Sequence, residues 1–269
     1  MPDERPNRFP EPARPEPEVE EAFGRLVAEG AVRLARPWPS LAVTGLLGGV
    51  DVGTGVLAYL LVARVTGEPL LAGAAFSIGF AALLLARSEL FTENFLVPVT
   101  AVAARHGRPR ALLRLWSVAL AGNLAGGWLV AWLITRGYPE LRDTAISTAT
   151  HYARLGVNLR SFALAVLAGM VITLMTRMQY ATESLGVRLV AALLFGALLA
   201  AGQLFHSVLD SIFMFAALTA GRAPFGYLDW LGALAWSVFG NIVGGVGLVA
   251  FLRMPRVAHR LARERARQR

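Results

Sequence analysis

Two polar stretches decide how this chain folds: Arg87-Ser88-Glu89-Leu90-Phe91-Thr92-Glu93-Asn94 and His206-Ser207-Val208-Leu209-Asp210-Ser211. Each interrupts a long apolar run, at 70–104 and at 189–221, about midway along it. A helix needs about 20 apolar residues to cross a bilayer, so each run is too long for one span and too short for a hairpin of two. We therefore predict two membrane helices that are broken where these polar residues lie.

Four further apolar runs are each compatible with a single span, at 41–64, 111–135, 161–176 and 227–252. The whole chain of 269 residues is 55% hydrophobic and only 16% charged, which is typical of a membrane protein rather than a soluble domain. The predicted fold class is therefore all-α, with six transmembrane helices of which the second and the fifth are broken.

The two halves of the chain repeat one pattern. The breaks at Ser88 and His206 are 118 residues apart, and so are the motifs Gly122-Asn123-Leu124-Ala125-Gly126-Gly127 and Gly240-Asn241-Ile242-Val243-Gly244-Gly245. Three spans per copy is an odd number, so the second copy enters the membrane from the opposite side. Inverted repeats with broken helices place a substrate path near the bilayer midplane. The predicted repeats are 37–136 and 159–254, joined by an external loop at 137–158.

The two ends of the chain differ in composition from the spans. Residues 1–17 hold six prolines and several acids, without the basic and apolar parts of a signal peptide, and we interpret them as a disordered cytoplasmic tail. Between 18 and 36, apolar residues recur at helical intervals, which favours an amphipathic helix at the membrane interface. A helix that packs on the rest of the protein fits this pattern equally well. Residues 255–269 form a basic cytoplasmic tail, interpreted as a topology determinant rather than a lipid or RNA site.

All 26 basic residues are arginine, and their distribution sets the predicted topology. Nineteen lie on the side of the two termini and six on the other side, while Arg87 lies within a span. Both termini are therefore predicted to be cytoplasmic, because loops rich in positive charge stay on that side. Arginines confined to the ends of spans also argue against nucleic acid as a partner.

Five ionisable residues lie at apparent membrane depth: Asp51, Arg87, Glu89, Glu93 and Asp210. Each costs roughly 2.5 to 3.5 kcal/mol at a lipid-facing helix centre, so they cannot all face lipid. We predict that Arg87 pairs with Asp210 or with Glu93 across the pseudo-twofold axis. Such a pair serves structure more often than substrate binding, whereas an unpaired Arg87 would attract anions.

These motifs resemble those of the formate/nitrite transporter family. The resemblance covers roughly 37–254 and rests on the segments 88–92 and 205–207 and on the two Gly-Asn-x-x-Gly-Gly motifs, while Glu93-Asn94 and His-Ser-x-x-Asp resemble its poorly characterised inner-membrane branch. It implies an aquaporin-like fold, a homopentamer with one pore per protomer, a place in the bacterial inner membrane, and passage of small monovalent anions. This chain departs from common family residues at Phe205, Asp210 and Gly169.

The resemblance places a substrate pathway at the two breaks. Its candidate residues are His206, Thr92, Ser88, Phe91, Phe205 and Ser207. His206 can donate a hydrogen bond to an anion or exchange a proton, since imidazole titrates near neutral pH. Thr92 and Ser88 offer uncharged hydroxyl groups, and Phe91 and Phe205 an apolar constriction. Alternatively, His206 bonds a carbonyl freed by the break, and the hydroxyls satisfy other freed backbone groups.

Other residues have predicted roles beside this pathway. Arg154 and Arg160 border the fourth span and form an electropositive vestibule, or else extend to the membrane interface as arginines commonly do. Small residues spaced by four pack helices closely, and asparagines bond across helices. The residues expected to do so are Gly122, Asn123, Gly126, Gly240, Asn241 and Gly244.

The predicted function is a membrane channel or transporter for small monovalent anions such as formate or nitrite. A neutral acid crosses an apolar constriction more cheaply than a bare charge, so we expect a proton link through His206. The alternatives are a neutral small-solute channel and a non-transporting structural membrane protein, although no Asn-Pro-Ala pair marks the breaks. The chain has no cysteine, no paired histidine spacing and no nucleotide loop, so we expect no enzyme activity, no cofactor and no metal. The expected partners are a small anionic solute, the lipid bilayer and other copies of the chain.

Overall fold

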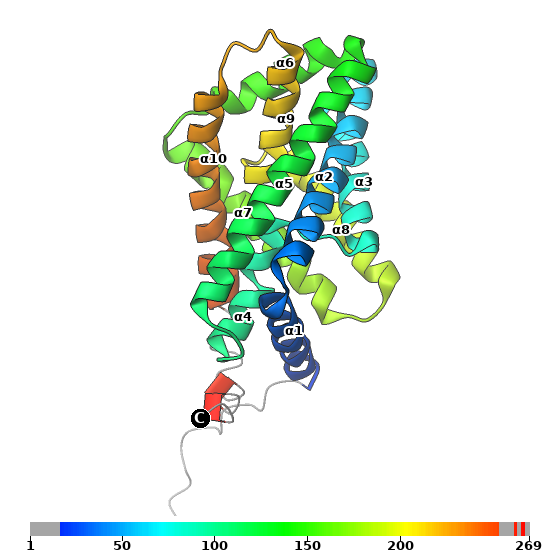
Figure 1. Cartoon of the computed structure of the whole chain (residues 1–269). Coiled ribbons are helices and arrows are strands. Elements are labelled where there is room, and N and C mark those ends of the chain that lie inside the picture. Colours follow the sequence, from blue (N-terminus) through cyan, green and yellow to red (C-terminus); the bar gives the residue numbers. More distant parts are fainter. Residues whose placement is uncertain (1–16, 253–260, 263–264, 267–269) are drawn as a thin grey trace, which may run out of the picture.

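The structure is a computed structural model that describes residues 17–252, 261–262 and 265–266. The described part of the chain is built from helices that run side by side in one bundle (Figure 1). The predicted N-terminal tail and most of the predicted C-terminal tail lie outside the described residues.

Within that part, five helices are long and apolar enough to cross a membrane. They are α2 (Trp38–Thr66), α3 (Pro69–Ala86), α5 (Pro109–Gly137), α7 (Leu159–Ala181), and α10 (Tyr227–Ile242) with its π-helical continuation (Val243–Ala250). After α3 the chain forms a short 3₁₀ helix, η1 (Phe91–Phe95), and then α4 (Val97–Ala103). After α8 (Leu185–Ala201) it forms α9 (Ser207–Ala220). The prediction of an all-α membrane protein with broken second and fifth helices is confirmed.

Both broken helices end in the same backbone conformation. Arg87, after α3, has φ 56°, and Gln203, after α8, has φ 47°, which are left-handed values that non-glycine residues rarely adopt. In each case the next N–H bonds back to a carbonyl five residues earlier, from Ser88 to Leu83 and from Leu204 to Leu199, both at 3.2 Å. These equivalent positions are 116 residues apart. The expected offset of 118 at the breaks is therefore wrong: His206 is the counterpart of Leu90 and not of Ser88.

The centre of the bundle is α9. Its residues from Ser207 to Ala217 are all buried, and α5 and α6 (Arg142–Ala153) pack against it. The region 137–158, expected as an external loop, thus contains a short 3₁₀ helix (Pro139–Leu141) and α6, whose Tyr152 is 1% exposed. This helix covers one end of α9.

Two helix pairs approach closely because glycine lines the contact. A Cβ at Gly126 of α5 would collide with the carbonyl of Leu46 on α2, and a Cβ at Gly244 would collide with the carbonyl of Val166 on α7. The packing contact between α2 and α5 is thus repeated between α7 and α10 in the second repeat.

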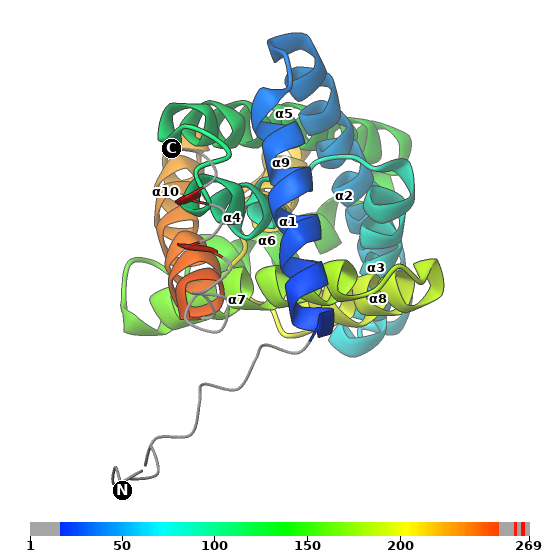
Figure 2. The ribbon, with the colours of Figure 1, turned by 90° about the horizontal axis from the view of Figure 1, so that it is seen from below.

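The helix α1 (Pro17–Ala35) lies at one end of the bundle and crosses its middle in the end-on view (Figure 2). Its apolar side chains Phe23, Leu26, Val27 and Leu34 are buried, and α1 packs mainly on α4. The apolar face of α1 is therefore turned to protein, as the packing alternative for this segment requires. We refer to this end of the molecule as the α1 side.

Candidate functional site

Two asparagines satisfy the backbone at the two breaks. Asn123 accepts a hydrogen bond from Phe91 N at 2.8 Å and donates to the carbonyls of Glu89 and Gly45 at 2.8 and 2.7 Å. In the second repeat, Asn241 accepts from Ser207 N at 3.0 Å and donates to the carbonyls of Phe205 and Ala165, both at 2.9 Å. Each asparagine thus ties a break to the helix beside it.

His206 and Thr92 bring the two breaks together at the centre of the molecule. Thr92 Oγ1 lies 2.9 Å from His206 Nε2, and both residues are 0% exposed. His206 is also the N-cap residue of α9, because its Nδ1 accepts a hydrogen bond from Leu209 N at 3.1 Å. The expected alternative, a bond to a freed carbonyl, is therefore not found; His206 binds a freed N–H instead.

That bond fixes which ring nitrogen of neutral His206 carries the proton. A nitrogen that accepts from Leu209 N–H holds no proton, so the proton lies on Nε2. Nε2–H then donates to Thr92 Oγ1, and the Thr92 hydroxyl proton is left to point elsewhere. No described residue accepts it. The Thr92 hydroxyl is therefore an uncharged donor without a partner at the centre of the molecule.

Asp210 stands one turn after His206 and holds the start of α9. Its Oδ2 accepts from His206 N at 2.7 Å, whereas its other oxygen, Oδ1, is buried without a hydrogen bond. Ser207 Oγ is also buried without a bond. Asp210 makes no ion pair with Arg87, contrary to prediction, because this carboxylate is committed to the backbone of the break.

The remaining pathway candidates lie at the breaks in different surroundings. Phe91 is buried and packs edge to face on Phe95 and Trp116, with ring centroids 5.0 and 6.3 Å away. Phe205 is also buried, and its carbonyl is held by Asn241. Ser88 is buried, and its hydroxyl lies beside the Asp51 carboxylate of α2 without a hydrogen bond of ordinary geometry. Ser88 lines a cavity on the α1 side, whereas Thr92 does not.

Glu89 pairs with α1 rather than with a residue of the spans. Its Oε2 lies 2.9 Å from Arg36 Nη1, and its Oε1 lies 3.9 Å from Arg33 Nη1. Arg33 also bonds Asn94 of η1, at 3.0 Å, and the Tyr180 hydroxyl, at 3.1 Å. Arg87, by contrast, is exposed and forms no ion pair with Glu93. Sequence reasoning expected the break to be neutralised by Arg87, but Arg33 of α1 and Arg36, directly after α1, supply the positive charges.

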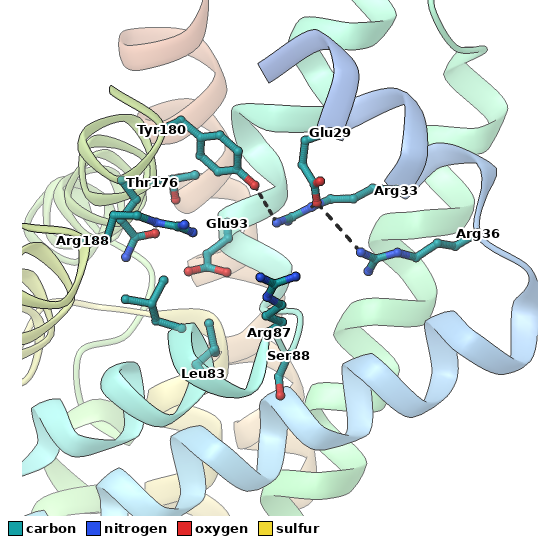
Figure 3. A pocket seen from close by; sticks show the side chains of 12 residues that line it. Glu29, Arg33, Arg36, Leu83, Arg87, Ser88, Glu93, Thr176, Tyr180 and Arg188 are labelled. Atoms are coloured by element: carbon teal, nitrogen blue, oxygen red, sulfur yellow. Dashed lines mark hydrogen bonds and ion pairs between the residues drawn. The ribbon is translucent and has the colours of Figure 1, made fainter. Parts of the chain in front are cut away.

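These groups surround a cavity of about 340 Å³ on the α1 side, called the inner cavity below. It is walled by α1, the end of α3, the first break, the end of α7 and the start of α8. The side chains of Glu93, Arg87, Arg188 and Arg33 turn toward its interior (Figure 3). Its charged lining consists of Glu29, Arg33, Arg36, Arg87, Glu93 and Arg188. The first break therefore opens into a chamber in which arginines outnumber acids.

Arg33 keeps its charge in this setting. Burial alone would lower the pKa of its guanidinium group, but Tyr180, Glu89 and Glu93 together with the hydrogen bond to Glu29 raise the pKa above its usual value. Arg33 is thus a permanent cation between α1 and the break.

Two predicted residues lie apart from this centre, whereas a third lies beside the first break. Asp51 is half-buried on α2 and faces the Ser88 side chain, although its Oδ2 makes no hydrogen bond. Arg154, directly after α6, and Arg160, in the first turn of α7, are both exposed. The inner cavity, however, is lined by other arginines.

Sequence reasoning missed several residues of the inner cavity: Arg33, Arg36, Gln179, Tyr180 and Arg188. A signal existed for two of them, since Arg33 and Arg36 are spaced by three residues, which places side chains on one face when the segment is helical, although α1 ends at Ala35. Tyr180 and Arg188 lie where α7 ends and α8 begins, and nothing in the pattern of apolar residues links them to the breaks.

Comparison with known proteins places the chain among membrane transport proteins. The family model described as formate/nitrite transporter matches residues 20–254. The inner membrane protein YfdC of Escherichia coli K12 is 26% identical over 249 residues, which are 88% of this chain and 78% of that protein. The formate channel BtFdhC of Bacillus thuringiensis is 25% identical over 251 residues, which are 86% of this chain and 92% of that protein.

Solved structures share the fold. A structure described as an FNT family ion channel has a TM-score of 0.80 at 20% identity, covering 86% of this chain and 97% of that one. A pentameric formate channel with formate bound has a TM-score of 0.67 at 22% identity, covering 80% of this chain and 95% of that one.

Proposed function

Given that the chain belongs to the formate/nitrite transporter family, we propose that it conducts small monovalent anions of weak acids, such as formate or nitrite, across the membrane. The similarity to the formate channel BtFdhC and to the pentameric formate channel supports this substrate class and a homopentameric assembly. The similarity to YfdC, an inner membrane protein, supports an inner-membrane location. The arginine distribution supports cytoplasmic termini and, with them, an α1 side that faces the cytoplasm.

The observation that carries the proposal is the contact between Thr92 and His206. Two breaks from opposite repeats meet there, and the contact leaves the Thr92 hydroxyl as a donor without an acceptor. A buried donor that lacks an acceptor loses the free energy of a hydrogen bond, and a passing anion would supply one. Because His206 Nε2–H donates to the same oxygen, the Thr92 hydroxyl is polarised toward the anion. The site stabilises an anion without a fixed positive charge that would trap it.

Proton coupling requires a further change at His206. A second proton on this ring would occupy Nδ1, where it would face Leu209 N–H and remove the N-cap bond of α9. Transfer of the Nε2 proton from neutral His206 would leave an imidazolate. We therefore propose that neutral His206 donates a hydrogen bond during anion passage, and that any proton-linked step is coupled to the release of Leu209 from Nδ1.

The test is solute flux into proteoliposomes, with formate, nitrite and glycerol at two pH values. Thr92→Val keeps the shape of the side chain and removes its donor. His206→Asn removes the contact with Thr92 while keeping a side-chain oxygen that can cap α9. We expect each variant to lower anion flux by about tenfold or more, since a hydrogen bond to a charged group contributes about 1.5 to 3 kcal/mol.

Thr100→Val is the matched control, because the Thr100 hydroxyl bonds only the carbonyl of Leu96 in its own helix. It should leave flux unchanged. Anion flux that survives in Thr92→Val and in His206→Asn would contradict the proposed site. Glycerol flux without anion flux would contradict the substrate class, and no flux of any solute would favour a structural protein.

A further inference from the structure

The direct route from the α1 side to the breaks is covered by α1. This helix crosses the middle of the bundle (Figure 2). Arg36 and Arg33 hold it to Glu89, and Arg33 also holds it to Asn94 and Tyr180. The pairs involve largely buried atoms, since the side chain of Glu89 is 2% exposed. A solute that arrives along the bundle axis would have to displace α1 and break these bonds.

A second way into the inner cavity runs beside α1. A further cavity of about 380 Å³, the side cavity, lies between α1 and the corner where α7 meets α8. Four residues line both cavities: Glu29, Gln179, Tyr180 and Arg188. These four side chains therefore lie between the two spaces, and their rearrangement offers a way to join the cavities without moving a helix.

This shared wall contains two buried donors that lack acceptors. Arg188 Nε and Gln179 Nε2 are both buried, and no described residue accepts a hydrogen bond from either. Gln179 as a whole is 5% exposed. Buried donors of this kind cost free energy unless a ligand satisfies them, and the ligand they select is an acceptor. A guanidinium beside a primary amide suits a planar group with two oxygens, such as a carboxylate or nitrite.

The charges around the wall agree with an anionic ligand. Arg33 and Arg36 are committed to Glu29 and Glu89. Two other arginines line the inner cavity, Arg87 and Arg188, and neither forms an ion pair with a described residue. Glu93 is the one further acid among the described residues of this lining. The uncommitted charge is therefore positive.

We propose that Arg188 and Gln179 form a holding site for a small planar oxyanion, which reaches the inner cavity sideways between α1 and the α7–α8 corner while α1 stays in place. This inference rests on the proposed function and specifies both its route of entry and its first binding site. The anion then passes from Arg188 toward Arg87 and the break.

The route is tested by locking α1 to the bundle. The chain has no cysteine, so Val27→Cys with Ala104→Cys introduces a single pair, at two residues packed in one cluster between α1 and the end of α4. Formate flux in proteoliposomes is measured after oxidation and again after reduction. We expect equal flux in both states, and we expect Thr182→Trp, which fills the side cavity, to reduce it. Flux that is lost on oxidation and restored by reduction would overturn the sideways route.

The holding site is tested with Arg188→Gln and Gln179→Leu. Each should raise the half-saturating concentration of formate by about tenfold, as expected for the loss of one charge-assisted hydrogen bond, with little change in the rate at saturation. Arg222→Gln removes an exposed arginine elsewhere, between α9 and α10, and should change neither value. An unchanged half-saturating concentration in both cavity variants would overturn the holding site.

Binding of nitrite to the detergent-solubilised full chain, measured by calorimetry, separates this inference from the proposed function. Nitrite that binds the wild type but not Arg188→Gln supports the holding site even if no flux occurs, in which case the proposed function alone has failed. Equal nitrite binding by the wild type and by both cavity variants would overturn the holding site even if flux is robust.

Discussion

Replacing Asn241 by alanine should destabilise the protein more than replacing any exposed asparagine. Its side chain makes three hydrogen bonds, to Ser207 N and to the carbonyls of Phe205 and Ala165. Side-chain hydrogen bonds between membrane helices average about 0.6 kcal/mol and reach about 1.7 kcal/mol. Three of them give a loss of about 2 to 5 kcal/mol, and the upper part of that range is expected because all three partners lie inside the bundle, away from water.

The assay is unfolding in mixed micelles by added dodecyl sulfate, followed through tryptophan fluorescence. Asn123→Ala should cost as much as Asn241→Ala, because it removes the equivalent bonds at the first break. Asn158→Ala is the control: this exposed residue caps α7 through Ser161 N, and the loss of a cap costs about 1 kcal/mol. If Asn241→Ala and Asn158→Ala are equally stable, the asparagines do not hold the breaks.

Three further results are expected from the described contacts. Gly126→Ala should cost about 1 to 3 kcal/mol in the same unfolding assay, since the added methyl group meets the Leu46 carbonyl, whereas Gly137→Ala, with nothing near its Cβ, should cost little. Glu89→Gln should speed trypsin cleavage after Arg33 by about tenfold, because it weakens a charged hydrogen bond that holds α1; unchanged cleavage would mean that other contacts suffice. Because the pKa of Arg33 is raised, its charge stabilises the packed position of α1 fully below the usual arginine pKa, and this stabilisation is lost only above it. A protease whose own activity does not change with pH should therefore cleave α1 equally slowly between about pH 7 and 10.

The positions of the spans could be predicted because hydrophobic length and a repeated motif are local properties of the sequence. The two asparagines also stood out, since each lies between glycines at the same place in its repeat. Their role could not be read in full: they bond the backbone of the breaks as well as the neighbouring helix. The position at which a helix ends determines which backbone groups the break leaves unpaired. The helices end at Arg87 and Gln203, and neither residue type signals the left-handed conformation found there.

The candidate site was predictable in part for the same reason. His206 and Thr92 stand at the breaks, and the structure brings them into contact. The partner of Glu89 was not predictable, because Arg36 lies 53 residues away, directly after α1 and outside the spans. An ion pair between a terminal helix and a membrane break depends on how α1 crosses the bundle, which the periodicity of α1 does not determine. The prediction for Arg87 was wrong because it considered only charges inside the spans.

The hydrogen bonds of Asn241 also have a consequence for biosynthesis. The second break is synthesised before Asn241, so the Phe205 carbonyl lacks this hydrogen-bond donor until the chain has grown by another 36 residues. The same delay, of 34 residues, separates Glu89 from Asn123. Until the last helix of each repeat is inserted, the broken helix has unpaired backbone groups, which are costly in the lipid bilayer. Each repeat should therefore leave the insertion machinery as a unit of three helices, and a nascent chain that stops before Asn241 should remain bound there.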